Sequence, residues 1–461
     1  MAGGFRGRRE AVLSGGIAGS IVRLAAPLMV SSSVNVLYEV VDTFWLSRLG
    51  EAALAVPSIA WPYRGIVVSV CFGLTAGLSA LVSQYVGAED YDMARRSTGS
   101  ILSLILAVSA LLSALLAAGV QFYLEVMHVP ARVSSIAVGY IEAVIASVPF
   151  LAAFIVFNVT LSSAGDTRTP MLLGVAASLL NAVLDPVFMF VLGLGVVGAG
   201  YATLASCVFS GTYSLYSFAT GRHGVRLGLR DLYPDPGILG LACRVSAPVV
   251  AQTTGMTAGF AVMVGVVSGL GTPVIAAYSI GQVLLGIDRV FALPLTRATG
   301  IVVGQSLGAG MRDRARRAAV TGLALVTGAA IAYIGSLMVF SRLFIGAFTS
   351  EPRAFACAQR MLFIFGPSIV FFHAFMLANS VARGSGHTLF VSLVGLARLW
   401  LLRIPGSWLL AYRLGLGDTG LWAGMALSNY VAGAVAAAWL LSGRWAAPVI
   451  GAGGRKCTGV C

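Results

Sequence analysis

Long apolar runs recur from one end of this chain to the other, and they decide what it can fold into. Many of them reach ~20 residues, the length that one helix needs to cross the hydrocarbon core of a bilayer. Only 10% of the 461 residues are charged, whereas a soluble domain carries roughly 25%. The runs do not alternate as barrel strands do. We therefore expect an all-α integral membrane protein whose main solvent is lipid.

The apolar runs divide into twelve expected membrane-spanning helices, six in each half. We divide the chain into an N-terminal lobe (1–220), a cytoplasmic linker (221–236), a C-terminal lobe (237–445) and a cytoplasmic tail (446–461). The expected spans lie near residues 20–47, 52–86, 95–125, 132–164, 169–192 and 198–220, and near 238–268, 273–307, 315–346, 353–383, 389–412 and 419–443.

The two halves repeat one another. Arg23-Leu-Ala-Ala-Pro27 recurs as Arg244-Val-Ser-Ala-Pro248, and Leu192-Gly-Leu-Gly195 recurs as Leu414-Gly-Leu-Gly417. A repeat held over several motifs indicates a duplicated structural unit. Six spans are an even number, so both halves share one orientation, as in transporters built from parallel repeats. We expect two pseudo-symmetric six-helix bundles.

The net charge of +13 comes from arginines in short loops. Their placement indicates membrane orientation rather than nucleic-acid binding, because they crowd into every second loop and so mark the cytoplasmic side. Both termini are then cytoplasmic, and the lipid bilayer is the expected partner. The crowded positions include Arg6, Arg8, Arg9, Arg95, Arg96, Arg168, Arg222, Arg226, Arg230, Arg312, Arg314, Arg316, Arg317, Arg444, Arg455 and Lys456.

Several enzyme and nucleotide-binding classes are disfavoured. A P-loop needs Gly-Lys-Ser/Thr, and the only lysine is Lys456, preceded by Arg455. Gly193-x-Gly195-x-x-Gly198 matches a dinucleotide fingerprint by letters, but it joins two spans and recurs in the second half. We interpret it as a duplicated tight turn. The four histidines are dispersed, so we expect no enzyme activity and no cofactor.

Ionisable side chains inside a bilayer cost ~2.5–3.5 kcal/mol each and are candidates for function. Asp42 and Glu39 lie three apart in the first span, with Asn35 and Tyr38 on the same helical face. Asp42 is a candidate to carry chemistry. Glu39 is either functional or hydrated near the outer membrane face.

A second candidate occupies Asn181-Ala-Val-Leu-Asp185-Pro186 in the fifth span. Asn181 and Asp185 lie four apart, so their oxygens face the same way. Pro186 cannot donate to the carbonyl of Ala182. A carboxylate, an amide and a free carbonyl form the start of a site for a hard cation, which prefers oxygen ligands.

Other polar residues within spans allow more than one interpretation. Pro27 and Pro248 each interrupt the first helix of a half, giving either a static kink or a moving one. We expect Asp288, Arg289, Arg398 and Arg403 to form a structural ion pair across helices. Glu142 lines a cavity or pairs with an arginine, and His373 is expected in core packing rather than in a proton relay.

Three further motifs stand in the first half: Asp42-Thr-Phe-Trp-Leu-Ser-Arg-Leu-Gly50, Ala80-Leu-Val-Ser-Gln-Tyr-Val-Gly87-Ala and Gly165-Asp-Thr. Together with Arg23-Leu-Ala-Ala-Pro27 and Asn181-Ala-Val-Leu-Asp185-Pro186, they resemble the motifs of MATE (multidrug and toxic compound extrusion) transporters. The resemblance covers about residues 17–443 and includes the duplication. It implies two six-helix lobes facing a central cleft, and export of organic cations or drugs in exchange for sodium or protons. It also implies a cell-membrane location and is compatible with a monomer.

Within that family the chain is most similar to the archaeal, DinF-type branch. The resemblance implies roles for residues in the first lobe. The NorM-type branch places acidic residues on helices 7 and 10, but Gln252–Gly269 and Phe363–Asn379 contain no Asp or Glu. The implied positions are a cation-coupling site at Asp42, Asn181, Asp185 and Thr203, where sodium is a possible ligand, a substrate cavity at Asn35, Tyr38 and Asn158, and a helix kink at Pro27.

Two questions stay open at the level of sequence. The coupling ion is either a proton shared between carboxylates or a sodium ion with Asn181 and Thr203 as extra ligands. The alternative function is a flippase for lipids or lipid-linked saccharides. A flippase favours a large cationic cleft, whereas carboxylates in the first lobe favour small cations.

Overall fold

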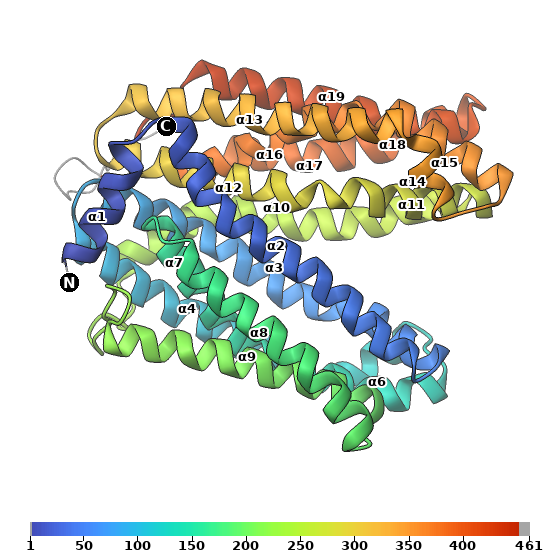
Figure 1. Cartoon of the computed structure of the whole chain (residues 1–461), viewed down its shortest axis with the longest axis horizontal. Coiled ribbons are helices and arrows are strands. Elements are labelled where there is room, and N and C mark those ends of the chain that lie inside the picture. The colour runs from blue at the N-terminus through green and yellow to red at the C-terminus, as the bar shows by residue number, and fades with distance from the viewer. Residues whose placement is uncertain (1, 451–461) are drawn as a thin grey trace. The chain divides into compact units, whose positions relative to one another are not determined.

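A computed structural model describes residues 2–450, apart from the side chains of residues 2–5, 51, 52 and 132. Throughout this described part every regular element is a helix (Figure 1), which confirms the expected all-α class. The predicted tail lies outside the described residues from 451 onward.

The helices follow one another with short connections. Up to the linker they are α1 (Ala2–Leu13), α2 (Ile17–Ser47), α3 (Glu51–Gly87), α4 (Tyr91–Ala118), α5 (Val120–Val126), α6 (Ala131–Ala146), α7 (Val148–Ser163), α8 (Arg168–Pro186), the π-helix η1 (Val187–Val191) and α9 (Gly195–Thr220). After the linker they are α10 (Pro236–Ser268), α11 (Thr272–Ile287), α12 (Arg289–Gly308), α13 (Arg312–Val339), α14 (Ser341–Gly346), α15 (Pro352–Phe365), α16 (Ser368–Ser385), α17 (Thr388–Ala397), the π-helix η2 (Arg398–Arg403), α18 (Ile404–Trp408), the π-helix η3 (Leu409–Arg413) and α19 (Gly417–Ser442).

The described helices are membrane-spanning in length and composition. Ten stretches are long and apolar enough to cross a bilayer, and α15 with α16 forms an eleventh that bends by 54°. The bend falls at Gly366 and Pro367, where proline removes a backbone donor. The expected sixth span is the 26-residue helix α9, which is rich in Ser, Thr and Gly and therefore less apolar.

The duplication is visible in local backbone geometry. Each half contains a five-residue π-helix, η1 or η3, followed by a tight turn and a 26-residue helix, α9 or α19. The turn residues Gly193 and Gly195 have φ of 66° and 56°, and Gly415 and Gly417 have 67° and 56°. Such positive φ values favour glycine. The glycine motif is therefore a duplicated turn, as interpreted from the sequence.

The chain forms two compact units. Unit 1 comprises the residues up to Glu10 and Pro27–Ser246, and unit 2 comprises Ala11–Ala26 and the chain from Ala247 onward. Helix α2 passes from unit 2 to unit 1 at Pro27, and α10 passes from unit 1 to unit 2 beside Pro248. The two prolines singled out in the sequence thus mark the positions where each helix changes unit. The lobe boundaries at 220 and 237 stay predictions.

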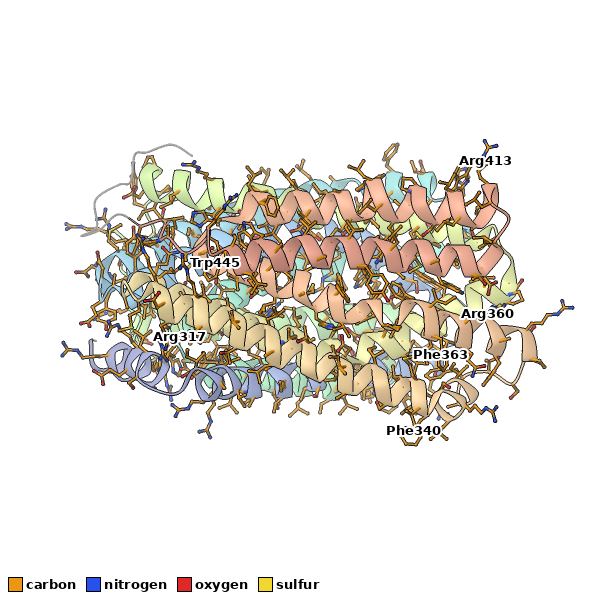
Figure 2. The ribbon with its side chains drawn as sticks, turned by 90° about the horizontal axis from the view of Figure 1, so that it is seen from above. Arg317, Phe340, Arg360, Phe363, Arg413 and Trp445 are labelled. Carbon is orange, nitrogen blue, oxygen red and sulfur yellow. The ribbon has the colours of Figure 1, made fainter. Side chains whose placement is uncertain are left out.

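Each unit has its own apolar core. The core of unit 1 includes Val56, Ile141 and Met189, and that of unit 2 includes Met263 and Trp422, all nearly inaccessible to solvent. In unit 2 the long helices run alongside one another (Figure 2). Arg317 and Trp445 lie toward one end of them, and Phe340, Arg360 and Arg413 toward the other.

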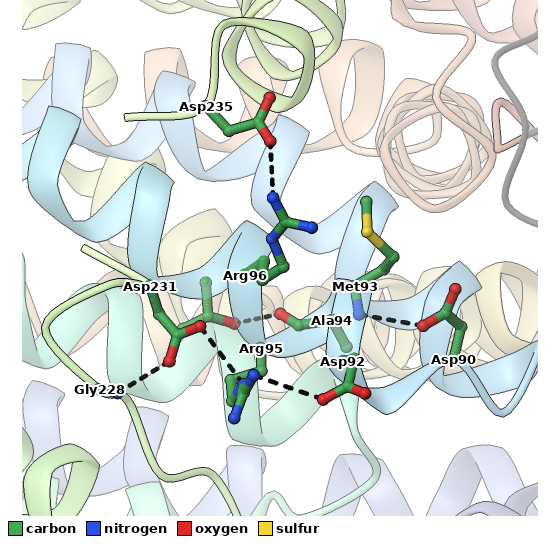
Figure 3. Close-up of polar contacts among 10 residues, drawn as sticks. Asp90, Asp92, Met93, Ala94, Arg95, Arg96, Gly228, Asp231 and Asp235 are labelled. Carbon is green, nitrogen blue, oxygen red and sulfur yellow. Dashed lines mark hydrogen bonds and ion pairs between the residues drawn. The ribbon is translucent and has the colours of Figure 1, made fainter. Parts of the chain in front are cut away.

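The linker is fastened to α4 by ion pairs within unit 1. Arg95 Nε lies 3.4 Å from Asp231 Oδ1, and Arg96 Nη2 lies 3.2 Å from Asp235 Oδ2 (Figure 3). A Cβ at Gly99 would collide with the backbone of Asp231, so the close approach needs glycine. Arg95 and Arg96, which the sequence offered only as orientation signals, therefore also hold the linker.

Helix α1 binds the loops at the same end of unit 1. Arg8 Nη2 lies 2.7 Å from Asp166 Oδ2, and Arg8 Nη1 donates to the carbonyl of His223 at 3.1 Å. Nε2 of His223 lies 3.1 Å from the Tyr213 hydroxyl. Partial burial lowers the pKa of His223, so the imidazole is neutral at pH 7. It contributes to the contact with Tyr213 as a hydrogen-bonding partner rather than as a charge.

We expect the substitution Arg8→Gln to lower the free energy of unfolding by about 1–2 kcal/mol, because it leaves a buried carboxylate short of a charged donor. Asp166 is only 8% exposed. The matched control is Arg6→Gln, since Arg6 lies 3.9 Å from Glu89 and both side chains are exposed. Exposed pairs contribute little. Equal shifts in thermal unfolding of the two variants in detergent would contradict the prediction.

Candidate functional site

The two carboxylates singled out in the sequence interact in unit 1. Asp42 lies on α2 and is half-buried, and Asp185 lies at the end of α8 and is inaccessible to solvent. The charge of Asp42 acts on Asp185. The fold therefore brings two acidic groups, far apart in the sequence, within electrostatic reach of each other. Like charges so placed disfavour each other unless a cation or proton is shared.

The oxygens of Asp185 and Asn181 have unused hydrogen-bonding capacity. Asn181 is 2% exposed, and its Oδ1 has no hydrogen-bond donor among the described residues. Both carboxylate oxygens of Asp185 are likewise buried without a donor in that part of the chain. Buried polar atoms are normally hydrogen-bonded. Three such oxygens on one helical face are suited to a cation or to a proton carried by the carboxylate.

Two further side chains, those of Tyr38 and Thr203, belong to this group of oxygens. Tyr38, one turn before Asp42 on α2, interacts electrostatically with both carboxylates and hydrogen-bonds with the Thr203 side chain. Thr203 lies on α9, and its hydroxyl donates to the carbonyl of Ala199 at 3.1 Å. Tyr38 was predicted for a substrate cavity, and that role stays a prediction.

Two residues that the sequence did not single out, Tyr140 and Arg64, also belong to this site. Tyr140 on α6 is 8% exposed and interacts electrostatically with Asp42, Asp185 and Arg64. Arg64 lies on α3, and its Nε is buried without an acceptor among the described residues. The cost of a charge in a span, which singled out Asp42, applies equally to Arg64. Tyr140 carries no comparable signal, because tyrosine is common in membrane helices.

The remaining predicted positions are not joined to this group by a hydrogen bond among the described residues. Asn35 is exposed on α2, seven residues before Asp42 and on its face. Asn158 is half-buried on α7 and accepts a hydrogen bond from Ser162 at 3.4 Å. Neither hydrogen-bonds to Asp42 or Asp185 within the described residues. Glu39 is exposed, and Pro27 lies within an α2 that stays helical on both sides of it. The cavity and kink roles stay predictions.

One prediction for the second half is wrong. Asp288 does not pair with an arginine in the described part of the chain, but with His373, whose Nε2 lies 2.5 Å from Asp288 Oδ2. His373 also contacts the carbonyl of Ile369 through Nδ1 at 2.7 Å. Both side chains are buried, so the histidine supplies the partner that we assigned to arginine. The sequence could not reveal this, because Asp288 and His373 lie on different helices.

Two hollows lie away from the carboxylates. One of about 480 Å³ in unit 2 is lined by residues that include Arg353, Arg360 and Asp418. Another of about 310 Å³ in unit 1 is lined by residues that include Glu89 and Arg95. Both lie beside loops and helix ends, and neither contains a carboxylate without a partner of the kind seen at Asp185. The unpaired oxygens, rather than these hollows, identify the candidate site.

Known proteins resemble this chain over nearly its full length. A family model described as MatE matches residues 27–187 and 248–409, once in each half. The probable multidrug resistance protein YpnP of Bacillus subtilis is 25% identical, over 94% of this chain and 97% of that protein. The FAD transporter of Shewanella oneidensis is 24% identical, over 86% and 89%. A crystal structure of MATE in the bent conformation is 25% identical with a TM-score of 0.88, over 95% of this chain and 96% of that one.

Proposed function

This chain belongs to the MATE family of membrane transporters, and from that premise we propose that it is a secondary active antiporter that exports small organic cations in exchange for protons or sodium ions. The relatives described as multidrug resistance proteins support export of drug-like molecules. The observation that carries the proposal is the pair Asp42 and Asp185, because an ion-coupled exporter needs a protected place where an ion binds and leaves.

The coupling ion would bind where acidic and amide oxygens converge. Asp185 and Asn181 offer buried oxygens without donors among the described residues, and Asp42 and Tyr38 on α2 interact electrostatically with Asp185. A proton would neutralise one carboxylate, and a sodium ion would take oxygens from both residues and from Thr203. Either ion removes the repulsion between the carboxylates, and the site therefore favours the ion-bound state.

Coupling follows from the free energy that the ion carries. Exporting one positive charge against an inside-negative membrane costs ~2.3 kcal/mol per 100 mV. An ion that moves inward down its gradient supplies this energy, provided that it binds one state of the transporter more tightly than the other. We propose that ion binding at the carboxylates releases the substrate, either by competition or by a change of α2 around Pro27. Solved structures similar to this chain are described as MATE in a straight and in a bent conformation.

The test is efflux from vesicles that contain the purified protein. With a fluorescent organic cation as substrate, we expect an imposed inward proton or sodium gradient to accelerate efflux, and separate gradients identify the ion. A flavin nucleotide serves as the anionic comparison, because one relative is described as an FAD transporter. If neither gradient accelerates efflux of the cation, ion-coupled export of cations by this chain is excluded.

A further inference from the structure

Two buried arginines of unit 2 lack a carboxylate to neutralise them. Arg398 is 1% exposed and Arg403 is 5% exposed. Within the described residues no carboxylate lies at ion-pair distance from either, and Asp288 is already paired with His373. Arginine inside a bilayer is retained only where its charge is compensated. Something other than a carboxylate of the described chain must therefore offset the charge of these two arginines.

Both guanidinium groups point at the same amide oxygen. Arg398 Nη1 donates to Asn429 Oδ1 at 3.0 Å, and Arg403 Nη2 donates to that atom at 2.6 Å. Asn429 Nδ2 donates in turn to Ser368 Oγ at 3.0 Å, and Arg403 Nε to Ser428 Oγ at 3.0 Å. The network is built of neutral acceptors only. It brings two positive charges close enough to act on each other and adds no negative one.

Arg398 keeps one edge of its guanidinium free of protein acceptors. Its Cζ lies over the rings of Phe372 and Phe375, at 4.8 and 5.5 Å from their centroids. Nε and Nη2 are buried and have no acceptor among the described residues. These are two adjacent donors through which arginine can make a bidentate hydrogen bond to an anion. The unused edge is therefore the one suited to anion binding.

The backbone explains why the two arginines meet. Arg398 and Arg403 are the first and last residues of the π-helix η2. A π-helix closes its hydrogen bonds between residues five apart, so these side chains are stacked on one face. An α-helix would rotate them apart. Such single π turns are frequent at functional sites, and this one positions two cations that an unbroken α-helix would separate.

Counted back from the π-helices η1 and η3, the second half carries a basic residue where the first carries Asn181. The π-helices η1 and η3 occupy equivalent places, beginning at Val187 and Leu409. Counting back equally from these starts pairs Asn181 with Arg403 and Asp185 with Ser407. The position that faces a carboxylate in unit 1 thus carries a guanidinium in unit 2, and the acidic position has become a neutral hydroxyl.

We propose that unit 2 binds a small monovalent anion, with chloride as the model ligand, on the Nε and Nη2 edge of Arg398 and close to Arg403. The ligand is small because both arginines are almost inaccessible, and it is an anion because every donor at this edge is positively charged. The anion offsets the repulsion between the two guanidinium groups. The site lies in the other unit from Asp42 and Asp185 and does not depend on how those residues work.

The first test measures thermal unfolding of the purified protein in detergent. Chloride or bromide replaces gluconate at constant sodium concentration and ionic strength, so that only the anion changes. We expect a saturating rise in Tm of roughly 2–4 °C in the wild type. Arg398→Gln should abolish the response. Arg413→Gln is the matched control and should keep it, because Arg413 stacks on the exposed ring of Trp408.

Equal Tm in chloride and gluconate, or an undiminished response in Arg398→Gln, would overturn the proposal. Should Arg398→Gln fail to fold, wild-type crystals grown in bromide decide the question. An anomalous scattering peak beside Nε of Arg398 supports the site, and its absence at saturating bromide refutes it.

Discussion

Replacing Asp185 by asparagine should slow gradient-driven efflux by at least about tenfold, which corresponds to about 1.4 kcal/mol in the coupled step. Asparagine has nearly the same shape, but it cannot carry the negative charge that holds a proton or a cation. Asp185 is fully buried and both its oxygens lack donors among the described residues. Rates are compared in vesicles under the gradient to which the wild type responds.

The same substitution should leave thermal stability unchanged or raise it. A buried carboxylate without hydrogen-bond donors costs more free energy than a neutral amide at the same place. Loss of transport together with an undiminished Tm would therefore locate the defect in coupling rather than in folding. Glu39→Gln is the matched control, since Glu39 is an exposed acidic residue on α2. Wild-type efflux by Asp185→Asn would remove this residue from the mechanism.

The spans and the duplicated turns could be predicted because each depends on the residues of one short segment. Apolar length fixes the spans, and the repeated Leu-Gly-Leu-Gly motifs coincide with matching turns at Gly193 and Gly415. Asp42 and Asp185 were found by the same kind of local argument, because a charge inside an apolar run is costly wherever it occurs. That the two carboxylates share one coupling-ion site stays a prediction.

What could not be predicted depends on neighbours from other helices. Tyr140 joins the carboxylates from α6, and nothing in its own segment indicates that. Asp288 was assigned to arginine on charge alone, yet the packing of its helix against α16 presents His373. Arg398 and Arg403 share a face only because the backbone becomes a π-helix there. A short segment indicates that a buried charge needs a partner, but the packing of the helices determines which residue is that partner.

The reversed polarity of the two halves gives the duplication a physical meaning. In unit 1 the site positions carry Asn181 and Asp185, and in unit 2 the equivalent positions carry Arg403 and Ser407. A duplicated fold keeps the backbone that positions a side chain while its chemistry diverges. If a cation acts in unit 1 and an anion in unit 2, the variants Asp185→Asn and Arg398→Gln should affect transport and anion-dependent stability separately.

The largest loss of stability is expected where α12 and α16 cross within unit 2. Gly300 and Gly304 are spaced by four on α12, as Ser380 and Gly384 are on α16. Small residues at this spacing let membrane helices approach closely. A Cβ at Gly384 would collide with the carbonyl oxygen of Gly300, and one at Gly300 would lie 2.6 Å from the carbonyl oxygen of Ser380.

We expect Gly384→Leu to destabilise the protein by about 3 kcal/mol or more, at or above the upper end of the range for overpacked cores, because the obstacle is backbone that no rotamer change can move aside. Gly335→Leu on α13 is the matched control, since a Cβ there meets nothing within 4 Å and leucine favours a helix more than glycine does. Thermal unfolding and the yield of monodisperse protein in detergent compare the two variants. A Tm for Gly384→Leu equal to that of Gly335→Leu would mean that the helices separate at little cost, and that this crossing does not hold unit 2 together.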